Sequence, residues 1–221
     1  QHWSDKTFSF CTTRKKSHKF NNGEFAMVGI QHEGKKLMRA YSFVSANHQD
    51  HLEFLSIKIE DGPLTSKLQN IKEGDQILVN SKATGSLVIH NILSGRNLYL
   101  IATGTGLAPF MSIIKDPETY SRFDKVVLTH TVQYPQELAY RSDLEFFNVD
   151  WEHVTKRKFR YFNTLTQASW PWKGRITKWI KEEKLYSEVG CERVDPKLDR
   201  FMVCGSQGLN TDLMEYFKSL R

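Results

Sequence analysis

The sequence predicts a two-domain α+β protein, an N-terminal antiparallel β-barrel followed by an α/β domain with a doubly wound parallel sheet. Three observations predict it. Residues 1–94 contain short stretches of alternating apolar and polar residues separated by turn sequences. Strand-like and helix-like stretches alternate in residues 95–221, and the first of these strands ends in Gly-Thr-Gly at residues 104–106. A chain of 221 residues is long enough for two small domains, and we expect their boundary between residues 94 and 95.

Six stretches of the first half have the features of half-buried strands. Residues 7–13, TFSFCTT, alternate apolar and polar side chains, as a strand does when one face packs on a core. Turn sequences such as NNGE, EDGP and KEGD separate the stretches. This spacing is typical of an antiparallel barrel or a sandwich, and we expect the barrel. The other five stretches span residues 25–30, 37–45, 52–60, 75–80 and 85–90.

The second half repeats a strand–helix unit. Such repeats predict a parallel sheet with helices on both faces, whose ligands bind beyond the carboxyl ends of the strands. Three strand ends stand out, with the sequences TGTG, THTV and CGS. The expected strands span residues 97–104, 124–132, 159–166 and 200–206, and the expected helices span residues 107–116, 135–147, 175–185 and 208–220.

Composition narrows the function classes. No apolar run approaches the roughly 20 residues of a membrane helix, so we expect no membrane association. Cys11, Cys191 and Cys204 form no CxxC pair, which argues against a disulfide scaffold or a zinc site and favours the cytoplasm. The net charge of +6 comes from scattered residues, which argues against nucleic acid and leaves a solvated basic surface or a face that steers an acidic partner. We expect a monomer without a metal.

The turn at residues 104–106 is a candidate for phosphate binding. Glycines allow close backbone approach, and the start of a helix presents free N–H groups to an anion. A dinucleotide-binding GxGxxG motif would have its third glycine where Pro109 stands, and Pro109 suits the first turn of a helix. On this motif alone, a tight turn without a ligand is the alternative.

Two segments of the first half add candidate contacts. Arg39 and Tyr41 point to the same side of a predicted strand, where a guanidinium can bond two pyrophosphate oxygens and a ring can stack on a flat cofactor. Ser42 adds a hydroxyl. In DGPLTSKL, residues 61–68, a Gly-Pro turn precedes Thr65 and Ser66 and suits a phosphate at the mouth of a helix. An arginine on an outer face and a plain helix cap are the alternatives.

In this order, RAYS, DGPLTSKL, ATGTGLAPF, VLTH and CGS closely resemble bacterial ferredoxin (flavodoxin)–NADP(+) reductases over essentially the whole chain. The resemblance implies an FAD-binding barrel followed by a pyridine-nucleotide domain. It implies that Arg39 binds the FAD pyrophosphate, that Tyr41 stacks on the isoalloxazine and that Ser42 lies near its reactive edge. Further implied FAD contacts are Ala40, Leu55, Ser56, Ile57, Lys58, Pro63, Leu64, Thr65 and Thr105. Implied NADP contacts are Gly104, Gly106, Val132, Gln133, Gln167, Arg175, Cys204 and Gly205.

The resemblance also implies an enzyme that passes electrons between NADP(H) and an acidic ferredoxin or flavodoxin through FAD. It places Tyr41, Ser42 and Cys204 at the reacting rings, and we expect His130 to be structural or to line the nucleotide cleft. Three alternatives stay open: an NADH-preferring flavin reductase, the reductase component of an oxygenase system, and a flavin or nucleotide sensor without turnover. Three cysteines cannot form a four-cysteine iron–sulfur site, and the intact RAYS segment argues against a sensor.

The sequence departs from the family pattern where the nucleotide is expected. The family usually has arginines for the adenosine 2′-phosphate at the positions of Gln133 and Gln167, and only Arg175 is kept. A charge-assisted hydrogen bond contributes about 1.5–3 kcal/mol, so we expect weakened selectivity for NADPH and use of NADH, unless Lys173 or Arg141 compensates. The family also carries a tail after the last helix. This sequence ends at Arg221, and without such a tail we expect FAD to be held less tightly.

Overall fold

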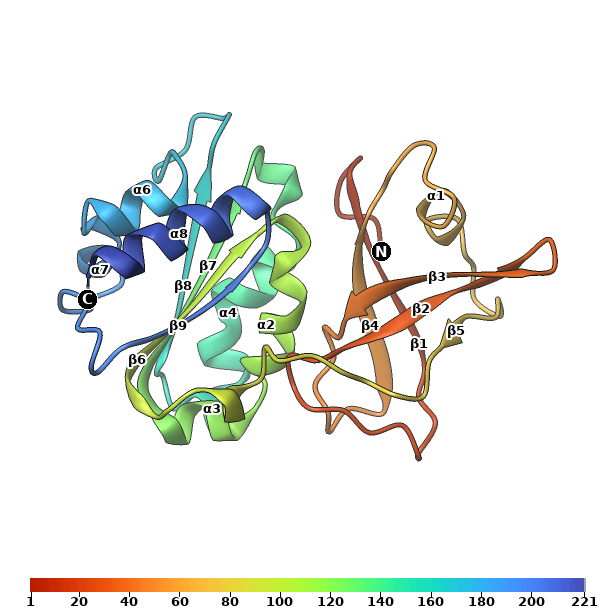
Figure 1. Cartoon of the computed structure of the whole chain (residues 1–221), viewed down its shortest axis with the longest axis horizontal. Coiled ribbons are helices and arrows are strands. Elements are labelled where there is room, and N and C mark those ends of the chain that lie inside the picture. The colour runs from red at the N-terminus through yellow and green to blue at the C-terminus, as the bar shows by residue number, and fades with distance from the viewer. Residues whose placement is uncertain (221) are drawn as a thin grey trace.

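The first half forms an antiparallel lobe beside the α/β lobe of the second half (Figure 1). The structure is a computed structural model and describes residues 1–220. The strands of the first lobe are β1 (Thr7–Thr13), β2 (Phe25–His32), β3 (Lys35–Ser42), β4 (His51–Ile57) and β5 (Leu78–Val79). They form a β1–β4 sheet and a β3–β2–β5 sheet, which an isolated bridge joins at Phe43 and Phe54. The antiparallel domain is therefore confirmed, whereas a closed barrel is not.

The predicted strand at residues 85–90 is wrong. An isolated bridge between Phe25 and Thr84 ends the pairing, because Gly85 follows with φ +137° and turns the chain away from the ladder. The apolar residues of the stretch instead enter the core between the lobes, where Ile89 is 2% exposed and begins a 3-10 helix, η1 (Ile89–Asn91). The strand predicted at residues 75–80 is shorter in the structure and consists of the two residues of β5.

The second lobe is the predicted doubly wound parallel sheet. Its strands are β6 (Gly95–Thr103), β7 (Phe123–Val132), β8 (Phe159–Leu165) and β9 (Arg200–Cys204), in the order β8–β7–β6–β9. Successive β6 residues point to opposite faces, and both faces are buried. Leu98 and Leu100 pack with Phe110 and Leu144 on one face, whereas Tyr99 and Ile101 pack on the other. The first face is covered by α2 (Ala108–Ile113), α3 (Pro117–Arg122), α4 (Arg141–Asp150) and α5 (Glu152–Thr155), and the second by α6 (Ile176–Lys181), α7 (Lys184–Glu188) and α8 (Gln207–Ser219).

Three of the expected helices are shorter or divided. Residues 104–107 form a 3-10 helix, η2 (Gly104–Leu107), before α2 begins. Tyr140, with φ +58°, separates η3 (Pro135–Glu137) from α4, and Glu183, with φ +62°, separates α6 from α7. Helix α3 was not predicted. Asp116 caps its N-terminus, because the Asp116 carboxylate accepts a hydrogen bond from the backbone N–H of Glu118 at 2.9 Å.

The strand order creates a switch point. From the central β6, the chain continues through β7 and β8 on one side and reaches β9 on the other. The connections after β6 and β9 therefore leave in opposite directions and open a crevice at their carboxyl ends, where doubly wound sheets bind ligands. Within residues 1–220, no helix has both the length and the apolar character needed to cross a membrane.

Candidate active site

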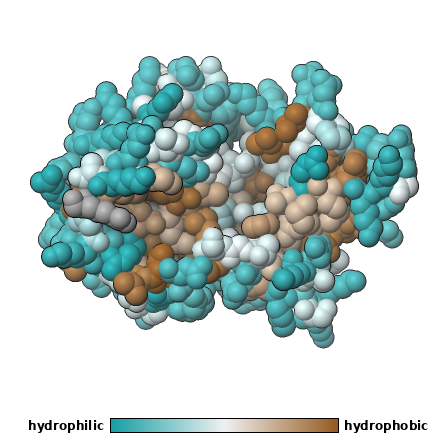
Figure 2. Space-filling view, viewed as in Figure 1, coloured by the Kyte–Doolittle hydropathy of each residue, from teal (hydrophilic) through white to brown (hydrophobic). Residues whose placement is uncertain are grey.

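A cleft of about 1260 Å³ lies between the two lobes at the carboxyl ends of the parallel strands. Figure 2 shows the hollow between the lobes, with apolar and neutral residues at its edges. Its volume exceeds the roughly 300–1,000 Å³ of a typical small-molecule pocket and suits two large ligands. It brings together the predicted residues Arg39, Ala40, Tyr41, Ser42, Leu55, Ser56, Ile57, Pro63, Leu64, Thr65, Gly104, Thr105, Gly106, Val132, Gln133, Gln167, Arg175, Cys204 and Gly205.

Lys58 is the predicted site residue that the cleft wall does not include. Its ammonium donates a 2.6 Å hydrogen bond to the backbone carbonyl of Ser4, and its backbone N–H donates to the carbonyl of Lys6 at 2.7 Å. Lys58 thereby fixes the segment before β1 against the end of β4. Any contact of Lys58 with FAD stays a prediction.

Strand β3 presents Arg39 and Tyr41 to the cleft. The Arg39 guanidinium is exposed and donates to the carbonyl of Met38 at 2.8 Å, which leaves other N–H groups for an anion. The Tyr41 ring is 8% exposed and meets the Phe10 ring edge-on at 6.1 Å between centroids. Ser56 donates its proton to the carbonyl of Ile57 at 3.1 Å, so the Tyr41 hydroxyl donates to Ser56 Oγ at 3.2 Å. Burial raises the pKa of Tyr41. The Tyr41 ring is thus a neutral aromatic surface with a fixed orientation.

The hydroxyls of Thr65 and Ser66 form hydrogen bonds within the Gly-Pro turn that precedes and enters α1 (Thr65–Leu68). Thr65 Oγ1 accepts from the backbone N–H of Ile59 at 3.2 Å, and Ser66 Oγ donates to the carbonyl of Gly62 at 2.6 Å. Gly62 is required here, because a Cβ would lie 2.5 Å from Thr65 Oγ1. Thr65 reaches the cleft and Ser66 does not.

The ends of β6 and β9 meet so closely that only glycine fits between them. A Cβ on Gly106 would lie 2.3 Å from the carbonyl oxygen of Cys204, and a Cβ on Gly205 would lie 2.0 Å from Thr103 Oγ1. Thr103 Oγ1 accepts a hydrogen bond from the backbone N–H of Ser206 at 2.9 Å, which ties the two turns together. The backbone of these two turns therefore forms a rigid floor of the cleft at the switch point, on which a flat ring can lie.

His130 lies behind this floor and does not line the cleft. It is 1% exposed on β7, and its Nε2 lies 3.0 Å from the carbonyl oxygen of Gly104. Burial lowers its pKa to about 4, so the neutral ring donates Nε2–H to that carbonyl. His130 thus supports the turn and has a structural place, one of the two that the sequence analysis left open.

Sequence reasoning missed Lys6 and Glu137 in the cleft wall. Lys6 Nζ lies 3.0 Å from Glu137 Oε1 and donates to Gln133 Oε1 at 3.0 Å. Glu137 Oε2 accepts from the backbone N–H of Gln133 at 3.1 Å. Lys6 lies 127 residues before Gln133, and no local pattern could reveal such a contact. Other residues that line the cleft without having been predicted include Thr103, Thr131, Thr166, Ser206 and Asp212.

Arg141 and Lys173 do not line the cleft. Arg141 pairs with Glu145 at 2.6 Å and lies 4.9 Å from the centroid of the Trp170 ring. The described cations in the cleft wall are Lys6, Arg39 and Arg175. The proposed compensation for Gln133 and Gln167 by Arg141 or Lys173 is therefore not supported by their positions.

Comparisons with known proteins identify both halves. Residues 2–86 match the oxidoreductase FAD-binding domain family, and residues 100–214 match the oxidoreductase NAD-binding domain family. The ferredoxin–NADP reductase of Azotobacter vinelandii is 47% identical over 215 residues, which cover 94% of this chain and 82% of that protein. The ferredoxin–NADP reductase of Pseudomonas aeruginosa is 45% identical over 211 residues, which cover 94% of this chain and 82% of that protein.

A solved structure gives the same result for the fold. The ferredoxin NADP+ reductase from Neisseria gonorrhoeae, crystallised with bound FAD and NADP, superposes with a TM-score of 0.90 at 31% identity, covering 99% of this chain and 87% of that chain. The antiparallel lobe, the switch point and the cleft between them fit a flavin domain and a nucleotide domain. This chain belongs to the ferredoxin–NADP reductase family of FAD-dependent oxidoreductases.

Proposed function

We propose that the chain transfers electrons between NADP(H) and a one-electron carrier, a ferredoxin or flavodoxin, through bound FAD. The observation that carries the proposal is the cleft of about 1260 Å³, whose two walls come from the FAD-type lobe and the nucleotide-type lobe. In this proposal residues 1–94 hold FAD and residues 95–221 hold the nicotinamide nucleotide. FAD supplies the step between a two-electron hydride donor and a one-electron acceptor.

The residues of β3 fit the flavin nucleotide. The free N–H groups of Arg39 suit a pyrophosphate, which a guanidinium bonds with two parallel hydrogen bonds. Tyr41 is held by Ser56 and the Phe10 ring, so it offers a flat surface that does not rotate away. Ser42 also lines the cleft, where its hydroxyl can bond a polar ring edge. These three residues bind and orient FAD and do not react with it.

The residues at the switch point fit the nicotinamide. Gly106 and Gly205 let a ring approach the backbone, and Thr105 borders the flavin side. Burial raises the pKa of the Cys204 thiol, so it stays protonated near neutral pH and packs beside the rings without acting as a nucleophile. Such a site acts mainly by holding the two rings face to face, because the rate of hydride transfer depends on the distance between the rings and on their alignment.

The charge of the protein fits an acidic carrier. A net charge of +6 attracts a negatively charged protein and raises the rate of encounter, an effect that falls as salt is added. We therefore expect electron transfer to an acidic ferredoxin or flavodoxin to slow with increasing ionic strength.

The first test is a visible absorption spectrum of the purified protein, followed by anaerobic addition of NADPH and, separately, NADH. We expect a yellow protein that the nucleotide bleaches and that an added ferredoxin or flavodoxin reoxidises. A colourless protein that takes up no FAD contradicts the proposal, and bound flavin that neither nucleotide reduces favours a sensor. Arg39→Ala should weaken FAD binding, whereas Lys36→Ala, an exposed change on the same strand, should not.

A preference for NADH is a second candidate, and the cleft wall favours it specifically. The ends of β7 and β8 present Gln133 and Gln167, which lie side by side because the backbone N–H of Gln167 donates to the carbonyl of Gln133 at 3.1 Å. Neither carries a charge for a 2′-phosphate, and Glu137 pairs with Lys6 at 3.0 Å and so offsets the charge of the cation that contacts Gln133. Bleaching by NADH at much lower concentration than by NADPH would identify this form of the activity.

A further inference from the structure

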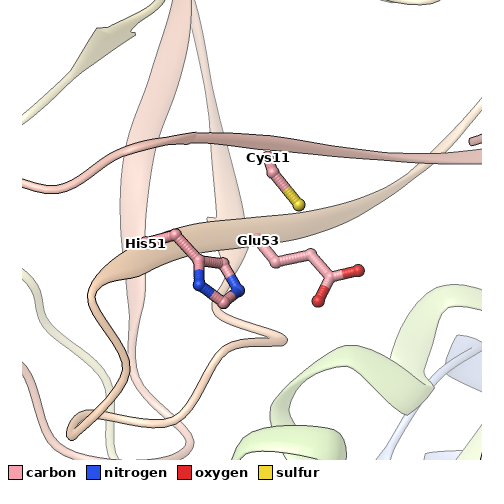
Figure 3. A group of neighbouring side chains, drawn as sticks. All are labelled: Cys11, His51 and Glu53. Carbon is pink, nitrogen blue, oxygen red and sulfur yellow. The ribbon is translucent and has the colours of Figure 1, made fainter.

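Three side chains with metal-binding atoms meet on the β1–β4 sheet, and none of the three lines the cofactor cleft. Cys11 on β1 lies opposite Glu53 on β4, and His51 lies two residues before Glu53, so the three side chains share one face of the sheet. Their sulfur, ring nitrogen and carboxylate oxygen all lie within 4.8 Å of one another. Figure 3 shows the three side chains gathered beside the β4 ribbon.

Two neighbouring groups contact these side chains in a way that suits a metal. The carboxylate of Asp50 lies 3.2 Å from His51 Nδ1, which places the proton on Nδ1 and leaves the lone pair of Nε2 free. The Tyr140 hydroxyl donates to Glu53 Oε1 at 2.6 Å and leaves Oε2 free. Hydrogen bonds from a second carboxylate and a hydroxyl are the usual supports of metal-bound histidine and carboxylate.

The surrounding charges set the conditions for binding. Burial, with the nearby Glu53 carboxylate, raises the pKa of the Cys11 thiol, so a metal must release the thiol proton to solvent when it binds. Lys115 lies within electrostatic reach of Glu53, and its Nζ donates to the backbone carbonyl of Val44 at 3.3 Å. Burial lowers the pKa of Lys115, and the nearby Glu53 carboxylate acts in the opposite sense.

We propose that Cys11, His51 and Glu53 bind a divalent transition metal of the zinc type. A thiolate, an imidazole and a carboxylate form a donor set that suits Zn²⁺ or Co²⁺ and disfavours Mg²⁺ and Ca²⁺, which take oxygen ligands. Three protein ligands leave a fourth position for water. The metal cross-links β1 to β4 and, through Glu53 and Tyr140, restrains the start of α4 in the other lobe. A search for closely spaced cysteines misses this site, because its ligands come from two separate strands.

The test is binding of Zn²⁺ to the chelator-treated, FAD-loaded protein, followed by calorimetry, with Co²⁺ as a spectroscopic probe. We expect one Zn²⁺ per chain and a Co²⁺ absorption band beyond the flavin bands, typical of a tetrahedral site with a thiolate. Cys11→Ser and His51→Gln should each weaken Zn²⁺ binding by more than about 100-fold, and Asp50→Asn by about 10–100-fold, the range found for groups that support a ligand.

Matched controls separate this site from surface binding. Cys191→Ser removes another thiol and His90→Gln removes another exposed histidine, and both should bind Zn²⁺ as the unaltered protein does. Melting temperatures measured without metal show whether each variant is folded, and only the unaltered protein and the controls should gain stability from Zn²⁺. Absence of stoichiometric Zn²⁺ binding, or equal affinity of Cys11→Ser and the unaltered protein, overturns the proposal.

Discussion

Lys6 Nζ and Glu137 Oε1 lie 3.0 Å apart and join the segment before β1 to η3 of the other lobe across the edge of the cleft. The Lys6 side chain is 59% exposed and the Glu137 side chain 12% exposed. Because the Lys6 side chain is largely exposed, the pair contributes little to stability, typically about 0–1 kcal/mol. Its main consequence is local, because Glu137 neutralises one of the described cations in the cleft wall.

Replacing Glu137 should improve the use of NADPH. In Glu137→Gln the ammonium of Lys6 is released from its ion pair and a negative charge is lost beside Gln133. Binding of a nucleotide with an extra phosphate should therefore improve more than binding of one without it. We expect the KM for NADPH to fall by up to about fivefold relative to that for NADH, as an interaction near 1 kcal/mol allows. Steady-state kinetics with both nucleotides checks this. Glu145→Gln, which breaks an ion pair outside the cleft, is the control, and an unchanged ratio of the KM values contradicts the prediction.

Arginine at position 167 should restore selectivity for NADPH more than arginine at position 133. Both positions line the cleft, but Gln133 Oε1 accepts from Lys6 at 3.0 Å, so an arginine there meets a like charge. For Gln167→Arg we expect a gain of about 10–100-fold in the preference for NADPH, the range of one charge-assisted hydrogen bond. Gln31→Arg adds the same charge on the distant β2–β3 hairpin and should change nothing. A larger gain from Gln133→Arg would show that the charge of Lys6 does not hinder an arginine at position 133.

His130 should make the fold less stable in mild acid. Its pKa is lowered to about 4 by burial, whereas an unfolded histidine has a pKa of about 6.5. Between these values the unfolded chain binds the extra proton, so the free energy of unfolding falls as the pH falls from about 6.5 to about 4. From pH 7 to pH 5 the loss amounts to about 2 kcal/mol.

His130→Gln isolates this contribution. Glutamine stays neutral at both pH values and keeps an N–H donor for the carbonyl of Gly104. Urea unfolding at pH 7 and pH 5 should show a smaller loss in this variant than in the unaltered protein by about 2 kcal/mol. His90→Gln, at an exposed position, serves as the matched variant. Equal losses for His130→Gln and the unaltered protein would show that His130 does not stay neutral in the native state.

The sequence predicted best those elements in which local pattern and tertiary burial agree. Strand β1 has the predicted bounds, although its burial does not alternate throughout: its first four residues are all buried, and only its last three are more exposed. The pattern at residues 85–90 failed because Ile89 is buried against the other lobe, with Leu87 packed beside the same cluster, and not within a ladder. Nearly all of the site residues that the family resemblance implied line the cleft, but much of the cleft wall was not predicted. Lys6 was missed because its partners lie more than a hundred residues away.

Gly106 should tolerate no side chain, although its φ is not left-handed. A Cβ there would lie 2.3 Å from the carbonyl oxygen of Cys204 and 2.6 Å from its carbonyl carbon, and backbone atoms cannot turn aside as a side chain can. Gly106→Ala should therefore push the ends of β6 and β9 apart, at a cost of about 1–3 kcal/mol in the free energy of unfolding. The same shift raises the floor of the switch point, so we expect slower flavin reduction by the nucleotide while FAD stays bound. Gly208→Ala is the matched control, since Gly208 also lines the cleft but a Cβ there meets nothing within 4 Å. Stopped-flow reduction and thermal melting of both variants check the prediction, and equal behaviour of the two would mean that the close approach of β6 and β9 does not position the nicotinamide.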